Sequence, residues 1–184
     1  PESPDVRYNY GAALWYSGAK DKAISELKES VRLDPSAGAS YSLLGLAQRN
    51  QADLAGSRLS LERAIALSPT EAANFIDLGL VFLRENQLDH ALAQFQAGLN
   101  AASLEPEPDW DDAVAGLREV LRKTPRADVH NVLGLLLGRK GASSEEVLAE
   151  FREALRLQPK NAEAHNNIGL VLAQTGEDEK AVAE

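Results

Sequence analysis

Three histidines, His90, His130 and His165, are the side chains of this sequence best suited to metal binding or proton transfer. His130 and His165 stand 35 residues apart, and each has a carboxylate two residues before it, at Asp128 and Glu163. Two imidazoles and two carboxylates could hold a zinc ion if they met. A histidine in a regularly spaced helical position more often fills space and makes one hydrogen bond. We therefore predict that these histidines pack and that the chain binds no metal.

Catalytic and cofactor motifs are absent from the sequence. There is no cysteine, which excludes disulfides, thiolate metal sites and a cysteine nucleophile but leaves the redox compartment open. The chain has no Gly-x-Ser-x-Gly turn, no His-Glu-x-x-His helix and no phosphate-binding glycine motif. We predict a protein that is not an enzyme and holds no cofactor. Its paired acids stand at or near expected helix starts, where negative charge suits the helix dipole: Asp111-Asp112, Glu145-Glu146 and Glu177-Asp178-Glu179.

The composition favours helices and argues against several classes of partner. Of 184 residues, 44% are apolar but only 5% aromatic, which suits helices that pack closely through alanine and leucine. The net charge is −9 and no stretch is rich in lysine and arginine, so we expect no nucleic-acid partner. No stretch approaches the roughly 18 consecutive apolar residues of a membrane helix, so we expect a soluble chain, either cytoplasmic or periplasmic and secreted. Both ends have the look of cuts in a longer protein.

Glycine and proline recur with one period along the chain. Such a period, with small residues at two fixed positions and proline at a third, is typical of a helix-turn-helix solenoid, in which each unit buries its apolar face on the next. The function then lies on a surface. The markers are Gly11, Gly45 and Gly79, each 34 residues apart; Gly134 and Gly169, 35 apart; and the pairs Pro35–Pro69 and Pro125–Pro159, both 34 apart.

Each unit is predicted to form two helices. In the first unit, apolar residues recur every three or four positions on both sides of a turn at residues 17–20. Gly11 falls inside the first helix, where glycine costs up to ~1 kcal/mol relative to alanine, so we predict close approach by the partner helix. Ser68 and Glu71 have the spacing of a capping box opening the next helix. Alanines at a matching position would serve the same close packing: Ala23, Ala64, Ala91, Ala154 and Ala181.

The unit resembles the tetratricopeptide repeat, whose pattern is a large residue, then Leu-Gly, an aromatic or aliphatic residue, alanine, an aromatic residue, alanine and proline. The resemblance implies an all-α, right-handed superhelical solenoid of antiparallel helix pairs. Ser103 departs from the pattern where proline is expected, and one extra residue lies near Ala142. The matching residues are Tyr41, Leu44, Gly45, Ala64 and Pro69; Phe75, Leu78, Gly79, Phe82, Ala91 and Phe95; Leu133, Gly134, Leu137, Phe151, Ala154 and Pro159; and Ile168, Gly169, Leu172, Gly176 and Ala181.

The period breaks once. Gly79 and Gly134 are 55 residues apart, 21 more than one period, so we predict that one repeat lacks its first helix. The resulting divisions are three repeats in residues 1–103, a proline-containing linker and an orphan second helix in 104–126, and two further repeats in 127–184, the last truncated. We expect eleven helical segments. The orphan helix opens at Trp110, and we predict that units on both sides bury it; a flexible hinge at residues 103–109 is the alternative.

The family resemblance implies that the first helices line a concave groove for a peptide. Trp15, Tyr16, Asn9, Arg49 and Arg84 are the expected main contributors, although Trp15 could instead cover the end of the array. The basic residues of the family's carboxylate clamp are absent, and its asparagine ladder is only partly present, at Asn9 and Asn167. The predicted lining is Tyr8, Asn9, Trp15 and Tyr16; Ser42, Leu46, Arg49 and Asn50; Asp77, Leu80 and Arg84; Asn131 and Arg139; and Asn166, Asn167 and Gln174.

Three functions fit these expectations. The first is a non-catalytic interaction scaffold that binds a peptide or protein segment in the groove. The second is the substrate-presenting array of a larger enzyme, such as a protein glycosyltransferase. The third is a scaffold that self-associates through the cut ends of the solenoid.

Overall fold

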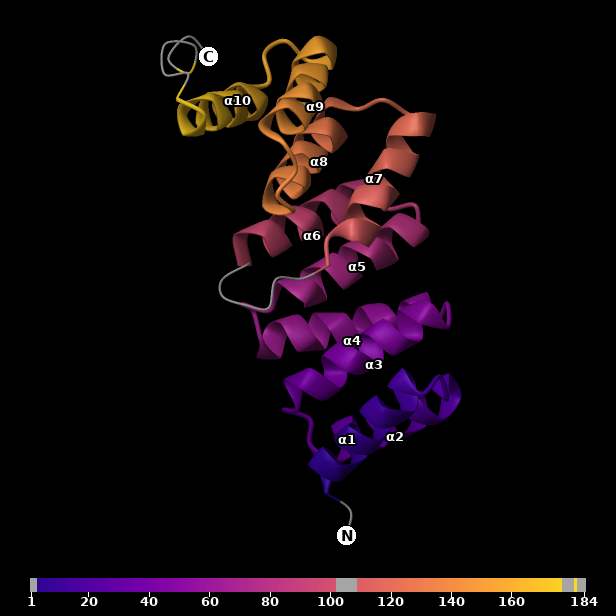
Figure 1. Ribbon diagram of the computed structural model, residues 1–184. Helices are drawn as coiled ribbons and strands as arrows, with labels where there is room; N and C mark the ends of the chain where they lie inside the picture. Colours follow the sequence, from indigo (N-terminus) through magenta and orange to yellow (C-terminus); the bar gives the residue numbers. More distant parts are fainter. Residues whose placement is uncertain (1–2, 102–108, 177–180, 182–184) are drawn as a thin grey trace. The chain divides into compact units, whose positions relative to one another are not determined.

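A computed structural model describes residues 3–101, 109–176 and 181, and its described residues form ten α-helices and no strand (Figure 1). No described helix is long and apolar enough to cross a membrane. The all-α prediction is confirmed. The helices are α1 (Pro4–Tyr16), α2 (Lys20–Leu33), α3 (Gly38–Asn50), α4 (Leu54–Leu67), α5 (Ala72–Arg84), α6 (Leu88–Ala101), α7 (Asp111–Lys123), α8 (Ala127–Arg139), α9 (Ser144–Leu157) and α10 (Ala162–Gln174).

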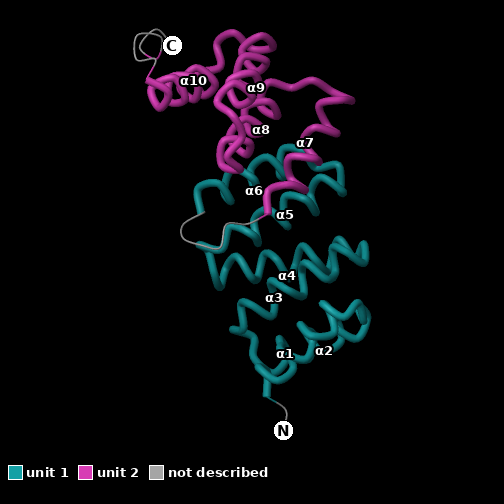
Figure 2. The backbone as a smooth tube through the Cα atoms, viewed as in Figure 1, with its two compact units in different colours: residues 1–108 teal, residues 109–184 magenta. Residues whose placement is uncertain are grey.

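The chain divides into two compact units (Figure 2). Unit 1, Pro1–Pro108, contains α1 to α6, which pack as three successive pairs, α1 on α2, α3 on α4 and α5 on α6. Unit 2, Asp109–Glu184, contains α7 to α10, with α8 and α9 as its one complete pair. Within each unit, the second helix of one repeat packs on the first helix of the next, as α2 does on α3 and α9 on α10. This is the solenoid arrangement of helix pairs that the period predicts.

Glycine sets the distance between the two helices of a pair. A Cβ atom placed on Gly45 would stand only 2.6 Å from Cγ of Leu61, and one on Gly79 would stand 2.5 Å from Cε1 of Phe95. Any side chain at these positions would force the helices apart, because buried side chains already fill the space. The predicted close approach is confirmed, and it recurs where Gly11 faces Leu27 and Gly134 faces Phe151.

Small and apolar residues form a continuous core along each unit. Ala23, Ala64 and Ala91 of unit 1 and Ala154 of unit 2 have no exposed surface. These alanines belong to second helices, where a small side chain lets the neighbouring helices approach closely. The prediction for these four alanines is therefore confirmed.

The loops confirm one sequence prediction and correct another. Residues 140–143 join α8 to α9, one residue more than the loops at 51–53 and 85–87, as the extra residue near Ala142 implies. The capping-box prediction for Ser68 and Glu71 is wrong. The N–H of Ser68 donates to the carbonyl of Ala64, so Ser68 closes α4, while Glu71 is the N-cap of α5 without a side-chain cap bond.

The helix after the period break has the features of a second helix. Helix α7 packs on α8 as α9 packs on α10, and its acidic first turn at Asp111 and Asp112 matches Glu145 and Glu146 of α9, 34 residues later. Trp110 and Leu117 are buried. Most of the predicted linker, at residues 102–108, lies outside the described residues, as does all of the eleventh helical segment except Ala181, which is helical.

Candidate functional site: the first-helix face

The first helices of unit 1 contact one another in sequence order, α1 with α3 and α3 with α5. Residues one repeat apart therefore fall side by side, and we call this surface the first-helix face. Its most regular feature is the last residue of each helix: Tyr16, Asn50 and Arg84 are spaced by one period and all are exposed, Tyr16 by 83%. The amide of Asn50 donates to the carbonyl of Leu46, 3.0 Å away. The structure thus aligns three of the predicted lining residues.

The aromatic residues at the start of the face have a structural role as well. Tyr8 and Trp15 are half-buried and pack against the core cluster that contains Leu27 and Leu44. The ammonium nitrogen of Lys20 lies 5.6 Å from the centre of the Trp15 ring, within the range of a cation–π contact. Trp15 is therefore held in place, whereas Tyr16 projects from the surface.

An ion pair joins the first helices of the second and third repeats. Nη2 of Arg49 lies 3.1 Å from Oδ1 of Asp77, and both side chains are mostly buried. Nη1 of Arg84 donates to the backbone carbonyl of Arg49 over 2.6 Å. Sequence reasoning placed all three residues on the lining but missed this link. The signal was opposite charges on neighbouring first helices, which are close enough to pair.

The other predicted lining residues of unit 1 differ in accessibility. Asn9 is exposed, Ser42 and Leu46 are half-buried, and Leu80 is buried. The hydroxyl of Ser42 donates to the carbonyl of Gly38 in its own helix. Asn9 thus adds a free-standing amide surface to the row of helix ends, whereas Leu80 belongs to the core.

In unit 2, an amide network joins α8 to α10. Asn131, which is buried, accepts a hydrogen bond from Nδ2 of Asn167 over 2.9 Å and donates one to Oε2 of Glu163 over 3.2 Å. The network holds two of the predicted lining residues together. Three others, Arg139, Asn166 and Gln174, are exposed. Asn166 also lines an open hollow with Lys160, His165 and Leu170.

The histidines do not converge on one another. Nδ1 of His130 lies 2.6 Å from Oε2 of Glu150, while Nε2 of His165 lies 3.1 Å from the carbonyl of Pro159. The ring of His90 stacks near that of Phe82. Across residues 3–101 and 109–176, no three histidines or carboxylates stand close enough to hold a metal ion.

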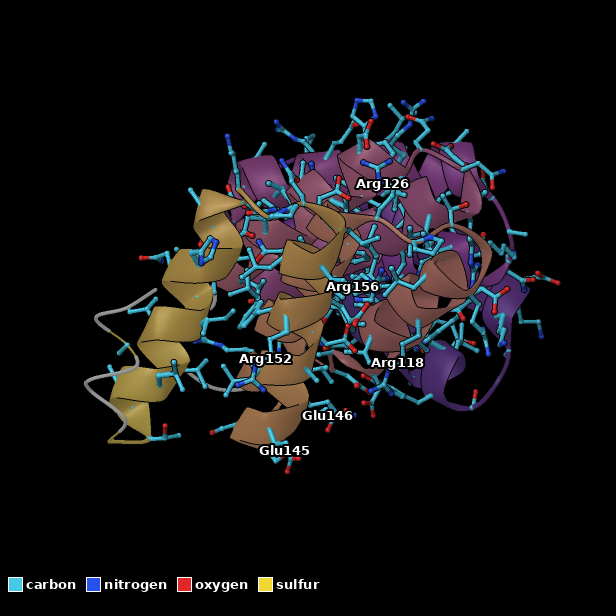
Figure 3. All side chains as sticks on the ribbon, turned by 90° about the horizontal axis from the view of Figure 1, so that it is seen from above. Arg118, Arg126, Glu145, Glu146, Arg152 and Arg156 are labelled. Carbon is cyan, nitrogen blue, oxygen red and sulfur yellow. The ribbon has the colours of Figure 1, made fainter. Side chains whose placement is uncertain are left out.

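The outer helices of unit 2 carry ion pairs of a structural kind. Arg118 of α7 and Glu146 of α9 point toward one another and form an ion pair of 2.8 Å (Figure 3). Hydrogen bonds from Lys123 and then Arg122 lower the pKa of Glu119. Burial acts to raise the pKa of Asp128, but the hydrogen bonds and charge of Arg126 outweigh it and the pKa is lowered. Each of these carboxylates stays ionised beside a base, which suits helix stabilisation better than proton transfer.

Comparison with known proteins places these features in a family. Residues 4–36 match the family model described as "Tetratricopeptide repeat", and residues 145–176 match one described as "TPR repeat". The TPR repeat-containing protein PA0015 of Pseudomonas aeruginosa is 32% identical over 87 residues, which cover 47% of this chain and 81% of that protein. Protein FlbA of Caulobacter vibrioides is 27% identical over 92% of this chain.

The chain spans only part of the longer relatives. It matches 30% of the length of FlbA and, at 32% identity over 68% of this chain, 10% of the cellulose synthase operon protein C of Escherichia coli.

Solved structures share the fold. A crystal structure of MamA covers 99% of this chain and 87% of its own at 19% identity, with a TM-score of 0.54. YrrB, described as a TPR protein with an unusual peptide-binding site, covers 96% and 80% at 20% identity, with a TM-score of 0.52. With the glycine contacts, the stacked helix pairs and the PA0015 match in agreement, the chain belongs to the tetratricopeptide repeat family.

Proposed function

We propose that this chain is a non-catalytic interaction scaffold that binds a peptide or an extended protein segment along the first-helix face of unit 1. Tetratricopeptide repeat proteins are generally scaffolds of this kind. The observation that carries the proposal is the exposed row of Tyr16, Asn50 and Arg84, which repeats one position on three adjoining helices. A segment lying across α1, α3 and α5 would meet all three.

The chemistry of the row suits a polypeptide ligand. Tyrosine and arginine contribute strongly at protein interfaces, and an asparagine amide can both donate to and accept from a peptide backbone. Asp77 balances the charge of Arg49 within the face, so the remaining groups are mainly apolar or hydrogen-bonding. We infer that the preferred segment has a large apolar side chain to rest on Tyr16 and no strong positive charge to oppose Arg84.

The fold likeness to YrrB gives independent support at the level of precedent, because that protein is described as having a peptide-binding site. The residues of unit 2 that point outward, among them Asn166 and Gln174, belong to a second first-helix surface. We propose that this surface makes separate contacts with the same class of ligand.

The experiment uses a displayed library of random peptides selected on the 184-residue chain. Dissociation constants for a selected peptide are then measured with Tyr16→Ala and Arg84→Ala. Each substitution should weaken binding by about fivefold or more, since truncating a contributing interface residue costs more than about 1 kcal/mol.

The matched control is Leu59→Ala. Leu59 is also a large exposed side chain, at 66%, but it belongs to the second helix α4. It should leave the dissociation constant unchanged, with circular dichroism confirming that every variant is folded. Equal losses from Tyr16→Ala and Leu59→Ala would show that peptides do not prefer the first-helix face.

A further inference from the structure

One face of α1 is exposed although its repeat equivalents are buried. Val6 is 57% exposed and Tyr10 is 54% exposed. One repeat later, Ser40 is 2% and Leu44 is 3% exposed. The same two positions are buried in the three later first helices: Asn74 and Leu78 in α5, Val129 and Leu133 in α8, and Ala164 and Ile168 in α10.

The structure shows what covers this face elsewhere in unit 1. Helix α2 packs on α3 and helix α4 packs on α5, so each buried face meets the second helix of the preceding repeat. A small, fully buried residue stands on the covering helix, Ser30 on α2 and Ala64 on α4. The hydroxyl groups of Ser30 and Ser40 lie 2.9 Å apart across the first of these junctions.

The exposed face of α1 has the chemistry of such a junction. Val6, Tyr10 and Ala13 are uncharged and largely apolar, and all three are exposed. The repeat that ends a solenoid normally presents a polar outer face to water. A helix that is apolar on both its inner and outer sides is typical of a buried helix. The face is therefore built to be covered.

We propose that Val6, Tyr10 and Ala13 form a docking surface for the second helix of a further tetratricopeptide repeat, placed directly ahead of α1 in the same polypeptide. Protein FlbA offers room for such a repeat, since this chain matches only 30% of its length. Val6 and Tyr10 are bulkier than Ser40 and Leu44, so the covering helix must carry alanine or glycine opposite them, with leucine or isoleucine one turn away. This surface is separate from the first-helix face and does not depend on peptide binding.

The test extends the chain by one period of its own sequence. A copy of residues 4–37 inserted ahead of Pro4 places a second α2 against the original α1. A second extended chain, with a copy of residues 38–71 in the same place, uses α4 as the covering helix and guards against one misfolded fusion. If the face accepts a second helix, the thermal unfolding midpoint of at least one extended chain rises by several degrees above that of the 184-residue chain.

A substitution then locates the effect. Tyr10→Glu in the inner copy of the extended chain should lower the unfolding midpoint strongly, because it buries a charge. The same change in the outer copy, or in the 184-residue chain, should have little effect. No rise in midpoint in either extended chain, or equal effects of the inner and outer substitutions, would overturn the proposal.

Sedimentation equilibrium of the 184-residue chain supplies the last outcome. The proposal expects a monomer at micromolar concentration. A dimer that Tyr10→Glu dissociates would assign the face to a second copy and overturn the assignment to a preceding repeat.

Discussion

Gly134 and Gly138 stand one turn apart in α8 and have opposite surroundings. A Cβ atom on Gly134 would lie 2.6 Å from Cε1 of Phe151, whereas one on Gly138 would meet only Val147, at 3.9 Å. We predict that Gly134→Ala lowers the free energy of unfolding by about 1–3 kcal/mol through overpacking. Gly138→Ala should raise it by up to ~1 kcal/mol, because alanine suits a helix interior better than glycine.

Urea denaturation of the two variants checks this pair. Both changes add the same methyl group to the same helix, so each controls for the other. Two destabilised variants would mean that Gly138 has a packing neighbour that the structure does not show, and two stabilised variants would mean that α8 and α9 do not approach as closely as described.

The Arg49–Asp77 pair makes a second residue-scale prediction. Removing one partner leaves a mostly buried charge without its counter-ion, so Asp77→Ala should lower the free energy of unfolding by about 1–3 kcal/mol. The double variant Arg49→Met, Asp77→Leu should recover most of that loss, since an apolar pair of similar size replaces a buried ion pair well. Chemical denaturation measures both. A double variant less stable than Asp77→Ala would contradict a pairing role.

At the scale of single helices, the sequence was sufficient for the pairing of elements but not for their ends. The positions of Gly45 and Ala64 predicted a close helix contact, because small residues at fixed spacing have few other uses in a helix. The spacing of Ser68 and Glu71 suited a cap for α5 equally well, but α4 continues far enough to make Ser68 its own last cap. The burial of Arg49 was also beyond sequence reasoning, since it depends on how closely α5 approaches α3.

Helix α7 carries a prediction about pH. Hydrogen bonds from Lys123 and Arg122 hold the pKa of Glu119 below its ordinary value of 4.5. A carboxylate whose pKa is lowered in the folded state adds stability above its unfolded pKa and loses it as the pH falls through the folded pKa. Glu119→Gln should therefore lower the unfolding midpoint at pH 7 and have less effect at a pH well below 4.5.

Glu145→Gln on the exposed surface of α9 is the control, because it removes the same charge from a helix of unit 2. Thermal melts of both variants at the two pH values make the comparison. An effect of Glu119→Gln that does not diminish in acid would show that the Lys123 and Arg122 contacts are not its cause.

At the scale of the whole molecule, the break in the period is the main question. The two compact units meet in sequence at Pro108 and Asp109, while the proposed divisions fall at residues 103 and 126. We predict that the missing first helix leaves the array undivided, so that both units unfold in one transition. Limited proteolysis checks this, because rapid cleavage at Leu104 or Glu105 into two stable halves would show that residues 103–109 form a hinge.

Peptide binding on the first-helix face is the central claim, and amide hydrogen exchange tests it most directly. Exchange is measured for the 184-residue chain with and without a selected peptide. The account predicts slower exchange in α1, α3 and α5, greatest around Tyr16, Asn50 and Arg84, and unchanged exchange in α2 and α4. Protection confined to α2 and α4 would contradict it and place the binding surface on the second helices.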